Sequence, residues 1–406
     1  MRVALVALAA CLVLPVLATP GGAVAASGST ATPIGPIGNY WSVPRVRALD
    51  SRISGPIPAK ATTTVRVTGL GYVPATGVVA ISVNLTVLRP TVTGSVSVFA
   101  DGTSWSGATM SFQAGQTGQN FETVPVTATG LIDIRNNTTR PLVLIVDILG
   151  YHKLPGELYG QYQPMTPARL LDTRTGQPVA AGRTRTFQVG RQAGIEPQSA
   201  DFPIAVVVNV TVLTPSRTGS LTVGKTDLAT NTATISFAAG QTEQGQLLEF
   251  LDPAGALSIR NNSGAGVQVI ADVVGAYKGV NITDIGGSDH FTVGTHYRVY
   301  DSRRRGDAPV PPGSTVVLHP FPVANAQSGV CAPLLNITVL TPSTAGSISA
   351  WRAGIPWDRT ATVSFAAHQT RQRQLMVQSG RSVQVRNNSS APINLIVDVD
   401  GWRTCV

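Results

Sequence analysis

The chain has 406 residues, a net charge of +9, 43% hydrophobic residues and 13% charged residues. This composition excludes an intrinsically disordered chain, which has few apolar residues and a high net charge for its length, and the length suffices for several hydrophobic cores. Beyond an N-terminal apolar run, no stretch of the sequence is long and apolar enough to cross a membrane.

Residues 1–26 have the pattern of a secretory signal peptide. Arg2 supplies the positive start, an apolar run from Val3 to Leu17 follows, and Ala23-Val24-Ala25 offers a small-residue cleavage site. Residues 27–39 are rich in Ser, Thr, Gly and Pro and are predicted to form a flexible lead-in. We therefore expect a secreted, extracellular protein that associates with the cell wall.

One segment, the key strand, occurs three times: SVNLTVLRP at 82–90, VVNVTVLTP at 207–215 and LLNITVLTP at 334–342. Around it an opening Asp-Ser/Thr-Arg, a Ser-Phe, a Gln-Thr, an Arg-Asn-Asn and a closing Asp recur with a period of about 125 residues. That period is too long for a single solenoid rung or propeller blade and fits a self-contained domain. We therefore expect homologous modules at 40–153, 160–278 and 289–406.

Within each copy, apolar residues recur at every second position, as a half-buried strand requires. In the first copy this pattern predicts strands at 45–52, 62–69, 79–87, 94–100, 108–114, 120–127, 131–137 and 141–151. No segment has the period of an amphipathic helix. The predicted fold is all-β, with three tandem homologous β-sandwich modules of jelly-roll or immunoglobulin type and about eight strands each.

The last strand of each copy is apolar on both faces and is therefore predicted to be central and buried. Its closing aspartate needs a cation or several hydrogen bonds. The available partners are the arginine of the opening motif and the Asn and Thr of the key strand. We predict structural ion pairs that join Asp147 to Arg52, Asp272 to Arg174 and Asp398 to Arg303.

Two cysteines, Cys331 and Cys405, follow the predicted signal peptide. In an exported protein a pair of cysteines is expected to form a disulfide, and two free thiols are the alternative.

The sequence shows no catalytic constellation. Its five histidines occupy no equivalent positions in the copies and form no His-x-x-x-His spacing. It also lacks a Gly-x-Ser-x-Gly, a phosphate-binding glycine loop and a Cys-x-x-Cys. We therefore predict a protein that is not an enzyme and needs neither a cofactor nor a metal.

Two tryptophans are candidate ligand-binding residues. Trp105 and Trp357 each lie 21 residues after the key asparagine of their copy, in a turn-rich segment. An exposed indole there would offer a stacking platform for a sugar ring. The alternative is that the ring folds over the end of the module as a plug.

Positive charge is concentrated in the third copy. Residues 290–406 carry a net charge of +6 and contain no glutamate. The candidate ligand-binding residues here are Arg304 and Arg305, with Arg371 and Arg373 adding to the same field. Such a field attracts anionic polymers, and the alternative is a merely solvated basic surface. No nucleic-acid-binding fold or aromatic-basic stripe is present, so nucleic acid is not an expected partner.

The motifs resemble those of a known group. ARLLDTRTG at 168–176, the VVNVTVLTP strand, SFAAGQT at 236–242 and IADVVGAY at 270–277 are similar to the LLDTR-type repeats of secreted actinobacterial proteins. The first and third copies depart at the opening, where RALDSR and RVYDSR stand. The resemblance implies modules that stand in tandem or accompany exported hydrolases, and it brings no catalytic or binding residues.

Together these features predict a secreted, non-catalytic binding protein. Its expected partner is a cell-wall or extracellular polysaccharide, or another anionic polymer, bound weakly by each module and more tightly by the array. One alternative is a structural or adhesive surface protein that contacts protein partners. Another is an accessory module set of a secreted hydrolase system.

Overall fold

Among the described residues, strands make up 56% and helix is almost absent, as the two-residue apolar period predicts. The computed structural model describes residues 40–103, 107–153, 161–195, 203–226, 233–278, 290–304, 306–321, 330–357, 359–379 and 382–404. These residues fall within the unit Pro33–Val406. The predicted signal peptide and lead-in lie outside the described residues. In the described part of the chain, no helix has the length and apolar character needed to span a membrane.

The first repeat builds two four-stranded sheets, ordered β1-β8-β3-β6 and β2-β7-β4-β5. Its elements are β1 (Tyr40–Asp50), α1 (Ser51–Ser54), β2 (Thr62–Arg66), β3 (Val78–Val87), β4 (Gly94–Ala100), β5 (Met110–Phe112), β6 (Gly118–Pro125), β7 (Leu131–Asn136) and β8 (Leu144–Lys153). The closing strand β8 is central in its sheet, between β1 and β3, and is buried along almost its whole length, as predicted.

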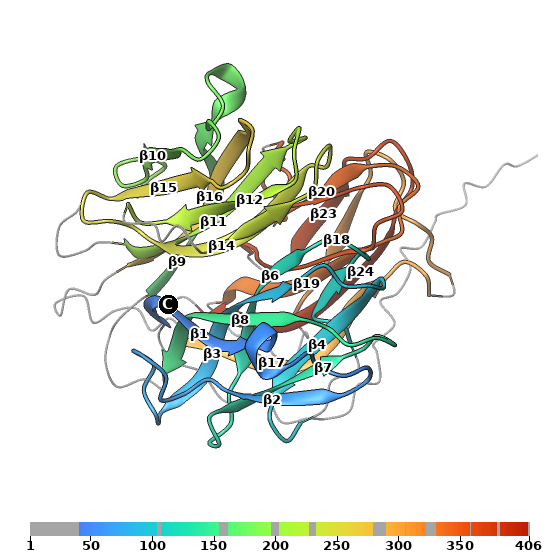
Figure 1. Cartoon of the computed structure of the whole chain (residues 1–406). Helices are drawn as coiled ribbons and strands as arrows, with labels where there is room; N and C mark the ends of the chain where they lie inside the picture. Colours follow the sequence, from blue (N-terminus) through green and yellow to red (C-terminus); the bar gives the residue numbers. More distant parts are fainter. Residues whose placement is uncertain are drawn as a thin grey trace, which may run out of the picture. The chain divides into compact units, whose positions relative to one another are not determined.

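The second repeat follows the same order, with sheets β9-β16-β11-β14 and β10-β15-β12-β13. Its elements are β9 (Gln161–Asp172), η1 (Thr173–Thr175), β10 (Thr184–Gln188), β11 (Pro203–Leu213), β12 (Gly219–Gly224), β13 (Ile235–Phe237), β14 (Glu243–Phe250), β15 (Ala256–Asn261) and β16 (Gln268–Lys278). Figure 1 shows these strands grouped together in green to yellow.

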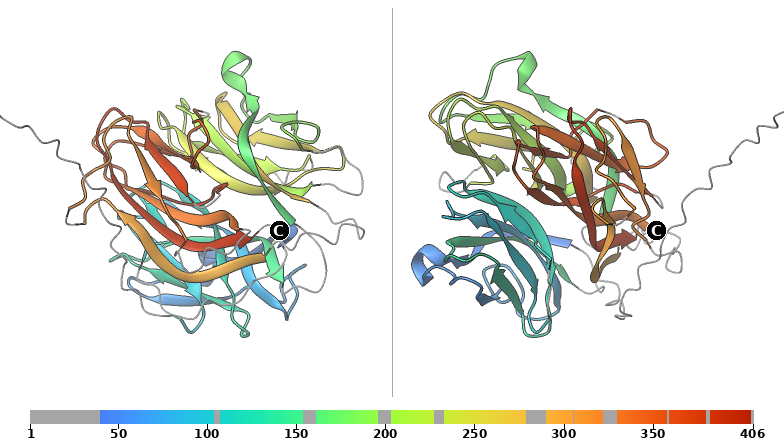
Figure 2. Two further views of the ribbon diagram at one scale, coloured as in Figure 1. Left: turned by 180° about the vertical axis from the view of Figure 1, so that it is seen from behind. Right: turned by 90° about the vertical axis from the view of Figure 1, so that its right-hand side faces the viewer.

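The third repeat gives the sheets β17-β24-β19-β22 and β18-β23-β20-β21. Its strands are β17 (His290–Asp301), β18 (Thr315–Leu318), β19 (Val330–Leu340), β20 (Gly346–Arg352), β21 (Val363–Phe365), β22 (Arg371–Met376), β23 (Val383–Asn387) and β24 (Asn394–Thr404). Both views in Figure 2 keep these orange to red strands together as one group.

The expected fold class is wrong in its architecture. The chain is all-β, but its six small four-stranded sheets form a six-bladed β-propeller of small sheets rather than three tandem β-sandwich modules of jelly-roll or immunoglobulin type. The apolar period correctly located the strands. The period did not reveal how the sheets associate. Alternation along a strand shows which face of the strand is apolar, but it does not show which other sheet packs on that face.

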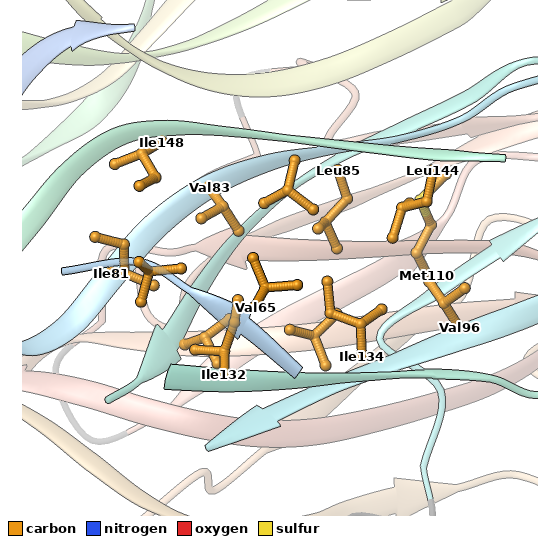
Figure 3. Close-up of a cluster of buried hydrophobic side chains, with 14 of the residues drawn as sticks. Val65, Ile81, Val83, Leu85, Val96, Met110, Ile132, Ile134, Leu144 and Ile148 are labelled. Atoms are coloured by element: carbon orange, nitrogen blue, oxygen red, sulfur yellow. The ribbon is translucent and has the colours of Figure 1, made fainter. Parts of the chain in front are cut away.

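Each repeat has a hydrophobic core between its own two sheets. In the first repeat, Ile81, Val83 and Leu85 of β3 point toward Ile132 and Ile134 of β7 (Figure 3). Equivalent clusters fill the second and third repeats. These side chains are almost entirely buried, which stabilises each repeat by about 1.5–3 kcal/mol per large apolar side chain before entropy is counted.

A fourth hydrophobic cluster joins the three repeats. It consists of Tyr40, Ala80, Phe121, Leu149, Ala205, Val207, Leu248, Val274, Tyr277, Ala332, Leu334 and Met376. These residues come from the faces of the key-strand sheets that point away from the cores of the single repeats, and the closing strands contribute to the cluster as their apolar character on both faces predicts. The key-strand asparagines on those faces, Asn84, Asn209 and Asn336, are only 2–3% exposed.

Candidate functional site

Each closing aspartate pairs with an arginine of the first strand in its repeat. Arg47 Nε lies 2.5 Å from Asp147 Oδ1. The corresponding distances are 2.6 Å from Arg169 to Asp272 and 2.8 Å from Arg298 to Asp398. A second nitrogen of every arginine reaches the other carboxylate oxygen. Since the three aspartates are nearly fully buried, these forked contacts supply the cation that their burial requires.

The predicted arginine partners were the wrong ones. Arg52, Arg174 and Arg303 instead bind the aspartate two residues before them, at distances of 2.5, 2.6 and 2.8 Å. Asp147 therefore pairs with Arg47 and not with Arg52. Likewise, Asp272 pairs with Arg169 and not with Arg174, and Asp398 pairs with Arg298 and not with Arg303.

A bulge in the first strand explains the pairing. Arg47, Arg169 and Arg298 lie directly opposite Asp147, Asp272 and Asp398 in the strand register. The register then slips by one residue before the opening aspartate. In a regular strand, residues three apart point to opposite faces, but one extra residue returns them to the same face. The same arginine therefore also reaches the opening aspartate, at 2.9–3.1 Å.

The result is a four-membered Arg-Asp-Arg-Asp ion-pair chain, which occurs in all three repeats. The opening aspartate lies between two guanidinium groups, and its pKa is lowered by them. Hydrogen bonds from Arg174 are the main cause that lowers the pKa of Asp172 to about 2, and those from Arg303 lower that of Asp301 to about 2. The pKa of Asp50 is lowered as well, chiefly by Arg52. These carboxylates stay ionised at every physiological pH.

The hydroxyl residue between Asp and Arg completes the motif. Ser51 Oγ, Thr173 Oγ1 and Ser302 Oγ each accept the backbone N–H of a closing-strand residue, at 2.7–2.9 Å. The recurring sequence is therefore Arg-x-x-Asp-Ser/Thr-Arg, in which every named side chain has a partner. The first arginine is visible in all three copies of the sequence, at a fixed spacing, and this spacing was the signal for the correct pair.

A groove of about 800 Å³ lies between the second and third repeats. One wall holds the ion-pair chain of the second repeat, with Arg169, Arg174 and Asp272, and the other wall carries Arg359. Further lining residues carry a hydroxyl group, namely Thr211, Thr214, Thr242, Ser347, Thr360 and Ser364. The only aromatic residue in the lining is Phe365, which is 3% exposed and belongs to the core.

Among the described residues, the acidic side chains of the groove do not balance its positive charge. Asp272 and Asp172 neutralise Arg169 and Arg174. The exposed Arg359 makes no ion pair within the described residues. Arg174 uses Nε and Nη2 on Asp172, and its side chain is 52% exposed. The groove therefore offers guanidinium donors and hydroxyls, the groups that bind carboxylates, phosphates and polyols.

The predicted ligand residues lie elsewhere or outside the described residues. Trp357 is half-buried, its Nε1 donates to Ser349 Oγ at 3.0 Å, and the Arg386 guanidinium lies 4.6 Å from its ring centroid. This packing matches the plug alternative, and only the face away from Arg386 is left for stacking. Arg304 is exposed in the turn after β17. Trp105 and Arg305 fall outside the described residues.

Two arginines assigned to the surface field are in fact buried. Arg371 and Arg373 are 5% and 4% exposed, and both bind Glu243 of the second repeat. Desolvation, with the neighbouring Arg371 adding to it, lowers the pKa of Arg373 to about 10. Burial also raises the pKa of Glu122 of the first repeat, whose carboxyl group interacts with Asp400 and Arg373 of the third repeat. These groups join repeats, so they do not contribute to an anion-binding surface.

The predicted disulfide falls outside the described part of the structure, which excludes Cys405 and the side chain of Cys331. Among the described residues, no cluster of three or more His, Cys, Asp or Glu side chains could hold a metal ion.

Comparisons with known proteins assign no family. No family model matches the sequence, and neither does any curated protein. Among solved structures, a chain from the atomic structure of Sulfolobus turreted icosahedral virus is 13% identical, with 91% of each chain covered and a TM-score of 0.18. A chain from an archaeal virus with a triple jelly roll fold and turret assembly is 12% identical, over 91% of this chain and 90% of that one, with a TM-score of 0.17. Scores this low do not define the fold.

Proposed function

We propose that this protein is a secreted, non-catalytic binding protein for an anionic extracellular polymer. The ligand is a polysaccharide or cell-wall polymer that carries carboxylate or phosphate groups. The observation that supports this proposal is the groove between the second and third repeats, where Arg359 is exposed and without an ion-pair partner among the described residues. The LLDTR-type repeats that the sequence resembles belong to secreted proteins, in keeping with this role.

The lining favours a charged, hydrated ligand over a stacked neutral sugar. Hydroxyl and guanidinium groups surround the groove, and no exposed aromatic ring lies among its lining residues. Stacking on Trp or Tyr is the usual source of affinity for neutral sugars, and the groove has neither. Electrostatic attraction is therefore expected to dominate, with each exposed charge pair contributing up to about 1 kcal/mol.

Retention on immobilised polymers tests the proposal. The mature protein should bind a polyuronate or a phosphate-backbone polymer, should bind a neutral glucan less, and should elute as salt rises from about 0.01 to 1 M, because exposed charges are screened. Comparison of the carboxylate and phosphate polymers distinguishes the two ligand sources.

Two single-arginine variants provide the matched comparison. Arg359→Ser should raise the apparent dissociation constant by about two- to fivefold, as expected for the loss of one exposed charge pair. Arg66→Ser removes an arginine of β2 that is also exposed but does not line the groove, and it should leave the dissociation constant unchanged. Equal effects of both substitutions, or binding to neutral glucan alone, would contradict the proposal. Retention only on a protein partner would favour the structural or adhesive alternative.

A further inference from the structure

Three glutamines at equivalent positions link the repeats head to tail. Gln119 of β6 donates from Nε2 to the carbonyl of Ala233 in the second repeat, at 2.9 Å. Gln244 of β14 donates in the same way to Ala361 of the third repeat, at 2.5 Å. Gln372 of β22 donates to Ala108 of the first repeat. The acceptors are themselves equivalent, so one type of contact runs from the first repeat to the second, to the third and back to the first.

A second set of bonds reinforces two of these junctions. Gln246 accepts the backbone N–H of Met376 at 2.8 Å, which ties the second repeat to the third. Gln374 accepts that of Thr123 at 2.7 Å, which ties the third repeat to the first. The equivalent position in the first repeat is Phe121, which packs in the fourth hydrophobic cluster and accepts no such bond. Among the described residues, the junction between the first and second repeats therefore lacks this second bond.

Burial makes these contacts specific. Gln119, Gln244 and Gln372 are 8%, 2% and 2% exposed, and their amide groups would lose hydrogen bonds to water without gaining partners if the repeats met in another register. Each repeat thus carries a donor face, on β6, β14 or β22, and an acceptor face, before β5, β13 or β21. A head-to-tail interface of one type that returns to its start is a closed cyclic assembly.

We propose that these donor and acceptor faces are sufficient to hold the repeats together, so that the partner each repeat recognises is another repeat of the same kind. The peptide linkers then raise the effective concentration of the repeats but do not specify how they associate. This inference does not rest on the proposed ligand. The groove, in contrast, needs the junction between the second and third repeats, because its walls come from both of them.

Cleavage of the folded chain tests the inference. Specific protease sites are placed at 154–160 and 279–289, between the described strands, and both are cut after folding. The three fragments should then elute and sediment as one particle with the mass of the uncut chain. Unfolding of the cut protein should become concentration dependent, because dissociation then accompanies unfolding, while the uncut protein should show no such dependence.

Substitution of the glutamines identifies the faces. Gln244→Leu combined with Gln372→Leu removes the donors on both sides of the third repeat. This change should weaken association of that fragment at least tenfold, because it removes both amide donors from the half-buried contacts that the third repeat makes with its neighbours. Gln188→Leu, on β10 within the second repeat, is the control, because Gln188 bonds only within its own repeat. Separation of the wild-type fragments after cleavage, with unfolding that does not depend on concentration, would overturn the inference, whatever the variants do.

Discussion

Replacing Arg169 by alanine tests the ion-pair chain most sharply. The change removes the guanidinium that lies 2.6 Å from Asp272, a carboxylate whose side chain is 3% exposed. Loss of one partner of a fully buried pair costs about 3–5 kcal/mol. Because the Arg169 side chain is 37% exposed, solvent screens the pair and we expect a smaller cost, about 2–3 kcal/mol. Arg174→Ala removes only the half-exposed partner of Asp172 and should cost about 0–1 kcal/mol.

Urea unfolding followed by far-ultraviolet circular dichroism measures both changes. The difference of about 2 kcal/mol corresponds to roughly a 30-fold difference in the folding equilibrium, which is well resolved in such titrations. Arg169→Lys is a further variant, because lysine keeps the charge but cannot make the forked contact, and it should fall between the two. Equal costs for Arg169→Ala and Arg174→Ala would refute the pairing, and a larger cost for Arg174→Ala would restore the pair of Asp272 with Arg174.

Three further changes have defined outcomes. Burial raises the pKa of Glu249 to about 7, so the folded state holds this proton more tightly than the unfolded state. The resulting stabilisation is fully present below pH 4 and is lost, by roughly 3 kcal/mol, as the pH rises from about 4.5 to 7. Glu249→Gln should remove this pH-dependent loss in unfolding titrations at a series of pH values. Thr173→Val should cost about 1–3 kcal/mol in the same assay, because it leaves the buried N–H of Val269 without its acceptor, whereas Thr173→Ser should cost much less. Gly219→Ala should lower the thermal unfolding midpoint, since its Cβ would clash with Ser263, and the cost is about 1–3 kcal/mol unless the strand shifts.

The local structure was largely predictable from the sequence. The segment expected at 79–87 forms β3 (Val78–Val87), and the one expected at 131–137 forms β7 (Leu131–Asn136). Periodicity located these strands because Val, Ile and Leu alternate with polar residues along them. The central place of β8 followed from its apolar character on both faces.

The association of the repeats was not predictable in the same way. A polar face on a strand predicts contact with water, yet Gln244 and Asn209 lie within a junction where another repeat satisfies or covers them. Nothing in a single strand distinguishes these two environments. The partner of Asp272 was missed for a related reason, since strict alternation places Arg169 and Asp172 on opposite faces, and only a bulge brings them together.

Hydrogen exchange of the protein with and without a bound polyanion is the most direct test of the proposed site. The groove predicts slower amide exchange at 211–214, 240–242, 345–347 and 359–366, which together form much of its lining. Protection at these segments, lost in 1 M salt and reduced in Arg359→Ser, is the expected result. Tight binding that leaves all four segments unprotected and protects another surface would contradict the assignment of the groove as the binding site.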